Sequence, residues 1–135
     1  MANEAVIIEL LGTPRGCPIR YTCAEATTIL KGTLLEVTDP RTVIANTNDN
    51  APVVGIAAAE KVGGDGSTTI AVYTNGIFDM LTDAGTDAAG VALANSATEN
   101  TLQTADAADM IQGSYVGYLL EEAGNAEVAA VRILK

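Results

Sequence analysis

The side chains that most often perform catalysis are scarce in this chain. Among its 135 residues there is no histidine, so the commonest general base and transition-metal ligand is missing. Every serine follows glycine or asparagine in a turn-like context, and none lies in a Gly-x-Ser-x-Gly elbow. Glu60 and Glu121-Glu122 follow apolar runs, where an exit of the chain into solvent explains them more simply than a catalytic pair. The sequence therefore predicts a protein that is not an enzyme.

Two loops have compositions that could suit binding sites. Gly63-Gly64-Asp65-Gly66 lacks the Lys-Ser/Thr of a phosphate loop, and its own aspartate would repel phosphate, so a hairpin turn is predicted. The segment Asn46-Thr47-Asn48-Asp49-Asn50 offers oxygen ligands at short spacing. It lacks the glycine and the distal glutamate of a helix-loop-helix calcium site. A solvated turn is favoured there, and a structural ion stays open as the alternative.

The two cysteines, Cys17 and Cys23, do not form a Cys-x-x-Cys motif, and no histidine is present to share a metal. The stretch Ala5-Val6-Ile7-Ile8 is predicted to be a poor signal peptide, because Glu9 interrupts it and no basic residue precedes Arg15. Two reduced thiols are therefore favoured over a disulfide. No cofactor and no resident metal are expected, and synthesis in a cytoplasm is the simplest expectation.

Charge limits the classes of partner. Seventeen acidic residues against seven basic ones give a net charge of −10, which repels phosphate backbones. Anionic membrane surfaces are disfavoured for the same reason, and no apolar run approaches the ~18 residues of a membrane span. We expect neither nucleic acid nor membrane as a partner. With a single Phe and no Trp, the core must be rich in small residues, so association with other chains is a plausible source of stability.

An internal repeat dominates the pattern. The strand-like Pro52-Val53-Val54-Gly55-Ile56-Ala57-Ala58-Ala59-Glu60 returns as Tyr115-Val116-Gly117-Tyr118-Leu119-Leu120-Glu121-Glu122. A Gly-led apolar strand precedes each copy, and a glycine turn with an alternating strand follows it. Gly55 and Gly117 are interpreted as points where strands approach closely. The repeat predicts an all-β fold, a small β-barrel or sandwich built from two related strand cassettes.

Strand and turn signals recur every 8–12 residues, as all-β domains require. Residues 1–16 are predicted to form an extended N-terminal arm, and residues 17–135 the β-barrel domain. Asn75-Gly76 predicts a type I′ hairpin turn. One helical turn is expected between Thr104, as N-cap, and Gly113. Tyr115 and Tyr118 have opposite strand parity, so at most one of them should point wholly inward. The expected strands lie at 18–21, 34–37, 42–45, 53–60, 68–73, 77–81, 90–94, 101–104, 114–121 and 127–134.

The order of these elements resembles the tailed-phage capsid decoration proteins, also called head-stabilising or cement proteins, of the lambda type. The resemblance is carried by the apolar arm, Ile29–Leu35 followed by Thr38-Asp39-Pro40-Arg41, Val54–Lys61, and Ala71–Asp79. It covers residues ~17–135 in element order. The sequence and length of the arm depart from the family pattern.

The resemblance implies a role in the virion. Such proteins are structural proteins of the bacteriophage head that bind the outer surface of the major capsid protein lattice, as homotrimers, and stabilise the mature viral capsid. The implied partners are the major capsid protein and further copies of this chain. An apolar arm on an acidic body suits β-augmentation of a partner. The candidate capsid-contact residues are Val6, Ile7, Ile8, Leu10, Leu11 and Arg15, and the candidate subunit contacts are Tyr115 and Tyr118.

A small non-viral β-barrel that binds a ligand or acts as a carrier is the alternative. A lipoyl- or biotin-type carrier needs a lysine at a hairpin tip, and neither Lys31 nor Lys61 has the expected flanking Met or Asp. A covalently modified lysine would distinguish the carrier from the decoration protein.

Overall fold

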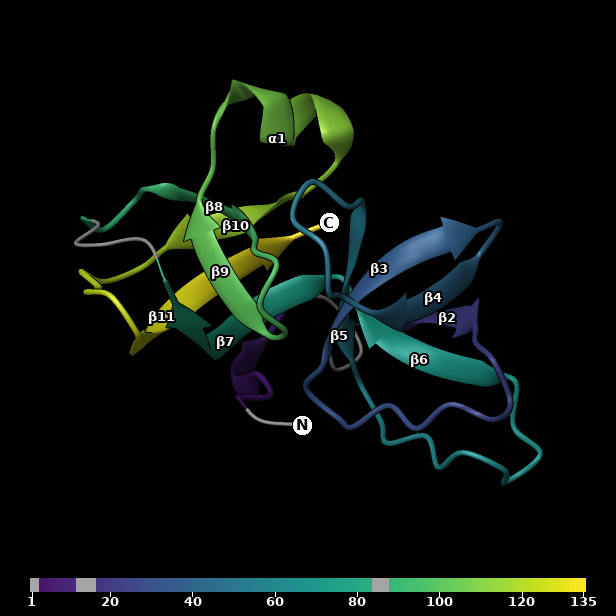
Figure 1. Cartoon of the computed structure of the whole chain (residues 1–135). Helices are drawn as coiled ribbons and strands as arrows, with labels where there is room; N and C mark the ends of the chain where they lie inside the picture. The colour runs from purple at the N-terminus through teal and green to yellow at the C-terminus, as the bar shows by residue number, and fades with distance from the viewer. Residues whose placement is uncertain (1–2, 12–16, 84–87) are drawn as a thin grey trace.

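The computed structural model describes residues 3–11, 17–83 and 88–135, and almost all of its regular structure is β-strand (Figure 1). Alternating burial along β6 and β7 shows why these segments are strands, because every second side chain enters a core. The elements are β1 (Val6–Leu10), β2 (Ile19–Thr22), β3 (Leu34–Asp39), β4 (Thr42–Ala45), β5 (Val53–Ala57), β6 (Thr69–Tyr73), β7 (Asn75–Thr82), β8 (Ala92–Asn95), β9 (Thr101–Thr104), α1 (Ala107–Gln112), β10 (Tyr115–Leu119) and β11 (Glu127–Leu134).

The strands form two closed barrels that lie side by side (Figure 1). Barrel 1 has the strand order β2-β4-β3-β5-β6, and barrel 2 has the order β7-β9-β8-β10-β11, closed by the pairing of β7 with β9. Strand β1 adds to β7 on the outside of barrel 2. The predicted all-β fold built from two related cassettes is confirmed, and each repeat closes into a barrel of its own.

The two barrels share their register as well as their order. Each begins with a strand that pairs in parallel with the third strand of its barrel, through Thr22 and Thr42 in barrel 1 and through Leu81 and Thr101 in barrel 2. All other pairings within the barrels are antiparallel. Apart from a shift at Thr38 in the pairing of β3 with β4, the registers match, so the sequence repeat is also a repeat of structure.

The repeated glycine lies at a bulge in both barrels. Gly55 pairs with Leu35 and Gly117 with Leu93, and the register shifts beside each pair because Val54 or Val116 is an extra residue. A Cβ on Gly117 would lie 1.7 Å from the carbonyl oxygen of Arg132. The prediction of close strand approach at these glycines is confirmed.

The predicted hairpin at Asn75-Gly76 is wrong. Both residues belong to β7, and the chain passes from β6 to β7 through Thr74 without a turn that pairs the two strands. The glycine is required for packing instead, because a Cβ on Gly76 would lie 2.9 Å from both the Glu9 carbonyl oxygen of β1 and the Phe78 ring. Glycine is required both in tight turns and in crowded strands, so its presence in the sequence did not distinguish the two.

The short helix α1 forms where one helical turn was expected, but its N-cap is Asp106, not Thr104. The Asp106 carboxylate accepts hydrogen bonds from the backbone N–H groups of Ala108 and Asp109, and the Asp109 carboxylate accepts one from the Asp106 N–H. This capping box satisfies donors that the first turn leaves free. Gly113 ends the helix with a φ of 79°.

The barrels are joined by one apolar cluster. Leu34, Val53 and Ile56 lie on the outer face of barrel 1, yet they are buried in the cluster that contains the interior of barrel 2, including Phe78 and Met80. The interior of barrel 1 forms a separate cluster. At the junction, barrel 1 therefore contributes part of its outer face, and barrel 2 contributes its interior.

Polar groups of barrel 2 satisfy the backbone at this junction. The Leu34 N–H donates to Asn100 Oδ1 at 2.8 Å, and the Val53 N–H donates to the Gly113 carbonyl at 3.0 Å. The Asn95 side-chain amide donates to the carbonyls of Asn48 and Ala51. Buried backbone donors are expensive to leave unpaired, so these bonds fix how the barrels meet.

Replacing Gly117 with alanine should destabilise the protein by at least about 2 kcal/mol, because the new Cβ collides with backbone that cannot move away freely. Gly64→Ala is the matched control: that glycine has a φ of 80° and open space around it, so only the backbone strain of about 1 kcal/mol applies. Chemical denaturation of the two variants and the wild type measures the difference. Equal losses for both variants would contradict the role of close packing at Gly117.

Candidate functional site

Strand β1 contains most of the predicted capsid-contact residues, and the structure divides them into two groups. Ile7 and Leu10 pack against the core of barrel 2, with Ile7 opposite Phe78. Val6 and Ile8 are 60% and 50% exposed. Leu11 is half-buried just beyond the strand, and Arg15 lies outside the described residues. The arm is therefore anchored on its own chain and still presents two apolar side chains to solvent.

The free side of β1 is the second feature of this surface. Within the described residues β1 pairs only with β7, so its other edge has no strand partner. The Ala5 N–H donates to the Gly32 carbonyl at 2.7 Å, which ties the start of the arm to barrel 1. Arm and barrels thus hold an extended apolar strand in place with one edge open, which is the geometry that β-augmentation needs.

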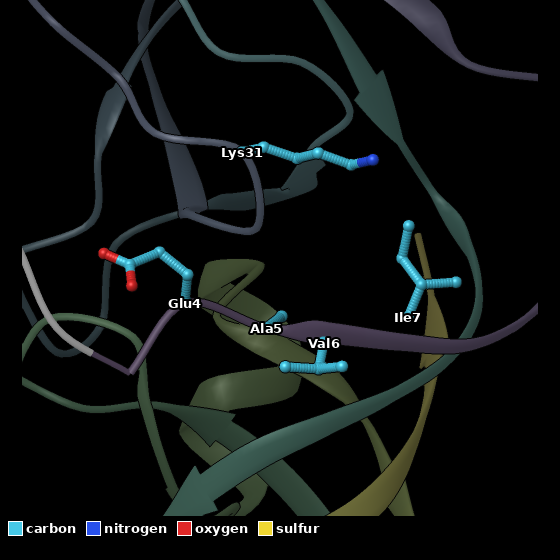
Figure 2. Close-up of a pocket in the computed structure, with 5 residues that line it drawn as sticks. All are labelled: Glu4, Ala5, Val6, Ile7 and Lys31. Atoms are coloured by element: carbon cyan, nitrogen blue, oxygen red, sulfur yellow. The ribbon is translucent and has the colours of Figure 1, made fainter.

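An open groove of about 450 Å³ lies between the arm and barrel 1 (Figure 2). Its lining residues are Glu4, Ala5, Val6, Ile7 and Lys31. Figure 2 shows the Lys31 amine and the Glu4 carboxylate pointing away from each other, so they do not form an ion pair across it. The groove combines apolar walls with one cation, the Lys31 amine, and one carboxylate, that of Glu4.

The two candidate subunit-contact tyrosines lie on the same strand face. Tyr115 pairs with Ala94, and Tyr118 pairs with both Ala92 and Arg132. The bulge at Val116 adds one residue between them, which cancels the opposite parity expected from their spacing, and both rings are half-buried. Neither tyrosine is wholly inward, and both point outward from barrel 2.

The polar loop at 46–50 is organised by a glutamate. Glu36 is buried and accepts hydrogen bonds from the side-chain amides of Asn46 and Asn48, at 2.7 and 3.1 Å, and from the Thr47 N–H. Among the residues that the structure describes, no group of three or more His, Cys, Asp or Glu side chains is placed to hold a metal. The donor groups of this loop are directed at Glu36, and a structural ion there stays an untested alternative.

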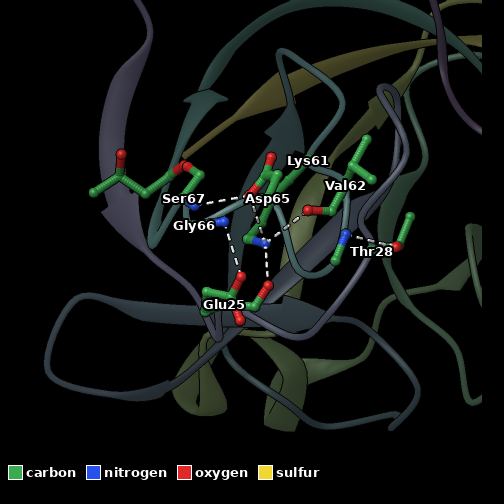
Figure 3. Close-up of polar contacts among 9 residues, drawn as sticks. Glu25, Thr28, Lys61, Val62, Asp65, Gly66 and Ser67 are labelled. Carbon is green, nitrogen blue, oxygen red and sulfur yellow. Dashed lines mark hydrogen bonds and ion pairs between the residues drawn. The ribbon is translucent and has the colours of Figure 1, made fainter.

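Lys61 is the centre of a polar cluster that sequence reasoning missed (Figure 3). Its side chain is only 2% exposed, and its amine donates to the Glu25 carbonyl at 2.6 Å and lies 3.6 Å from the Asp65 carboxylate. The backbone N–H of Ser67 and the nearby Lys61 hold the pKa of Asp65 below its usual range. Gly63–Gly66 form the predicted turn around this cluster. A lysine so enclosed is not at a hairpin tip, unlike a carrier lysine.

The two cysteines are not joined to each other and differ in access. Cys17 is exposed, whereas Cys23 is buried in the interior of barrel 1. Burial raises the pKa of the Cys23 thiol, and the nearby Lys61 opposes this only in part. The structure thus agrees with two reduced thiols.

Comparison with known proteins gives no assignment. No model of a known protein family matches the chain, and no curated protein is significantly similar to it. Among the described residues, no helix is long and apolar enough to cross a membrane. The candidate site is therefore defined by the chain's own surfaces: the β1 edge, the groove at Lys31 and the tyrosine-bearing face of β10.

A thiol reagent should modify one cysteine of the native protein quickly and the other only after unfolding. Cys17 is accessible, while Cys23 is shielded and its raised pKa leaves less thiolate near pH 8. Reaction with a chromogenic disulfide in buffer and in denaturant counts the two populations. The Cys17→Ser variant serves as the control and should show no fast reaction; a fast phase in that variant would contradict the burial of Cys23.

Proposed function

We propose that this protein is a capsid decoration protein, which binds the outer surface of a major capsid protein lattice and stabilises the mature head of a bacteriophage. The observation that carries the proposal is β1, an apolar strand that is held on barrel 2 with Val6 and Ile8 exposed and one edge unpaired within the described residues. The resemblance in element order to lambda-type decoration proteins supports the same role.

The energetics of β1 suit a binding strand. Val6 and Ile8 are already about half covered, so burial of the rest against a partner would contribute about 1–2 kcal/mol for each side chain, and backbone pairing along the free edge would fix the register. A few kcal/mol per copy is modest for one complex. Repeated over a lattice it becomes large, so the head would resist the outward pressure of packaged DNA.

The charge of the chain fits a position on the outside of a virion. A net charge of −10 on a small protein opposes contact with nucleic acid and favours a soluble outer surface. In this proposal the protein is made in the host cytoplasm and adds to the capsid from outside. The DNA then lies on the far side of the capsid shell, where the negative charge of the decoration protein costs little.

Self-association, as a homotrimer, is the second part of the proposal. Each barrel contains few large side chains, and Phe78 is the one phenylalanine of the chain. Tyr115 and Tyr118 share an outward face of β10, where large amphipathic rings are more typical of contacts than of free surface. These residues are the proposed subunit contacts.

A ligand-binding barrel is a second candidate, favoured by the groove beside Lys31. Lys61 is enclosed, and the Lys135 amine is bonded to the carbonyls of Gly113 and Tyr115, whereas Lys31 is exposed at the groove, so Lys31 is the lysine best placed for a covalent carrier function. The intact mass of protein purified from its natural source decides this point. We expect the mass of the unmodified chain, and an added group on Lys31 would favour the carrier.

Substituting both exposed arm residues, Val6→Asp and Ile8→Asp, should weaken binding to expanded capsids by about 100-fold or more, which corresponds to about 2.8 kcal/mol. Stability should change little, since neither side chain enters the core. Cosedimentation of the variant with purified capsids measures the affinity.

Val62→Asp is the matched control for this experiment, because Val62 is similarly exposed but lies in the β5–β6 loop of barrel 1. It should bind as the wild type does. If the arm variant bound capsids as tightly as the wild type, β1 would be excluded as the anchor. If the wild type did not bind capsids at all, the proposed function would be wrong.

A further inference from the structure

One outer face of barrel 1 forms a contact within the chain, because it packs against barrel 2. Leu34 and Ile56 form a cross-strand pair on the outer face of barrel 1, and Val53 lies beside them on β5. All three are buried against barrel 2. The backbone N–H groups of Leu34 and Val53 are satisfied by Asn100 and Gly113 of barrel 2. This contact is a docking of a barrel face onto the end of another barrel.

Barrel 2 carries the same face, by register. The pair Leu34–Ile56 corresponds to Ala92–Tyr118, and the pair Glu36–Val53 corresponds to Ala94–Tyr115, with the bulge at the same place. We call Ala92, Tyr115 and Tyr118 the tyrosine face. In barrel 2 these residues are half-buried and not covered as their counterparts are. The position that is an interface in one barrel is therefore partly exposed in the other, where only Ala94, opposite Tyr115, is fully buried.

Exposed apolar residues flank the tyrosine face along the chain. Helix α1 precedes β10 directly, and its Ile111 is 88% exposed and its Met110 59% exposed. Leu120 follows β10 and is also exposed. Exposed large apolar side chains in one neighbourhood of the chain, next to two tyrosines, are typical of a surface that is covered by a partner.

The end of barrel 2 onto which barrel 1 docks, here called the receiving end, also has an equivalent in barrel 1. In barrel 2 the docked end includes the β8–β9 turn, where Asn100 has a φ of 56° and accepts the bond from Leu34. The equivalent turn of barrel 1, between β3 and β4, has Arg41 with a φ of 55°. In Figure 1 this turn lies at the end of barrel 1 that is away from barrel 2, and its residues Asp39, Pro40 and Arg41 are exposed. Each chain thus has one unoccupied receiving end.

Both surfaces carry charges of both signs: the turn has Asp39 and Arg41, and the tyrosine face has Arg132 opposite Tyr118 and is followed by two glutamates. Arg41 is a cation on a chain with a net charge of −10; it donates a hydrogen bond to the Arg20 carbonyl and lies 5.8 Å from the centre of the Tyr21 ring. The tyrosine face offers two further aromatic rings, and the exposed Glu121 and Glu122 follow it in sequence. A guanidinium is attracted to both aromatic faces and carboxylates.

We propose that the tyrosine face of one copy binds the β3–β4 turn of a second copy, in the arrangement that barrel 1 and barrel 2 have within the chain, with the Arg41 guanidinium, which only donates, at the position of the Asn100 acceptor. Such a contact is heterologous, and it closes into a ring when the rotation between successive barrels allows it. Three chains would give a ring of six barrels. The inference rests on the self-association in the proposed function and is independent of the capsid.

Two variants test this contact, one for each surface. Tyr118→Asp places a charge in the tyrosine face, and Arg41→Asp reverses the charge of the turn with a residue that tolerates positive φ. Light scattering on a sizing column should give a closed oligomer for the wild type and a monomer for each variant. Mixed in equal amounts, the variants should form a 1:1 dimer and nothing larger, because the mixture retains one intact face and one intact turn.

The controls distinguish loss of this contact from unfolding and from a general effect of added charge. Val62→Asp should assemble as the wild type does, and thermal melts should show that both test variants remain folded. A wild type that stays monomeric at its highest soluble concentration would overturn the proposal, as would variants that still assemble. Monomeric variants that do not rescue each other on mixing would point to a symmetric face-to-face dimer and also overturn it. Oligomers that assemble as expected but bind no capsid would leave this contact standing and remove the proposed function.

Discussion

The burial of one barrel's outer face against the other barrel is the interaction on which the rest of the structure depends. Neither barrel has many large side chains, and Leu34, Val53 and Ile56 add a layer to the core of barrel 2 that its own strands do not provide. Their burial contributes up to about 1.5–3 kcal/mol for each side chain. The same contact satisfies two backbone donors through Asn100 and Gly113, so separating the barrels would expose apolar surface and polar backbone together. This one contact therefore fixes the relative position of the two barrels and stabilises the folded protein.

A barrel whose closing strands pair in parallel over a short stretch leaves part of one edge open, and the two barrels protect this edge differently. In barrel 1 the β2 edge follows Pro18, which has no N–H, and the Arg41 side chain covers the Arg20 carbonyl. In barrel 2 the corresponding part of β7 is covered by β1. The arm is thus part of the fold as well as the candidate anchor. Point substitutions at Val6 and Ile8 are for this reason more informative than deletion, which would uncover the β7 edge and remove the packing of Ile7.

The sequence predicted which residues are strands better than it predicted which strands pair. The bounds of β4, β9 and β11 follow from alternation and turn residues, which are local properties. The closure of two barrels depends on which strands pair across long sequence distances, and the alternation of buried and exposed side chains along each strand does not reveal this. The crowded Gly76 resembles a turn glycine in sequence, and the bulge at Val116 has no compositional signal, so the face of Tyr118 was unpredictable. The Lys61 cluster joins residues distant in sequence and was missed for the same reason.

The two barrels have different residues at the matched positions of this face, and the difference indicates how each face is used. At matched positions, barrel 1 has Leu34, Val53 and Ile56, which suit permanent burial, whereas barrel 2 has Ala92, Tyr115 and Tyr118. A tyrosine keeps its hydroxyl in water while its ring covers apolar surface, so it suits a face that must be soluble first and bound later. The receiving turns diverge in the same sense: Asn100 bonds a buried backbone group, and Arg41 carries an exposed charge. A duplicated contact has thus become permanent in one copy and, in the other, has the composition of an interface that forms between molecules.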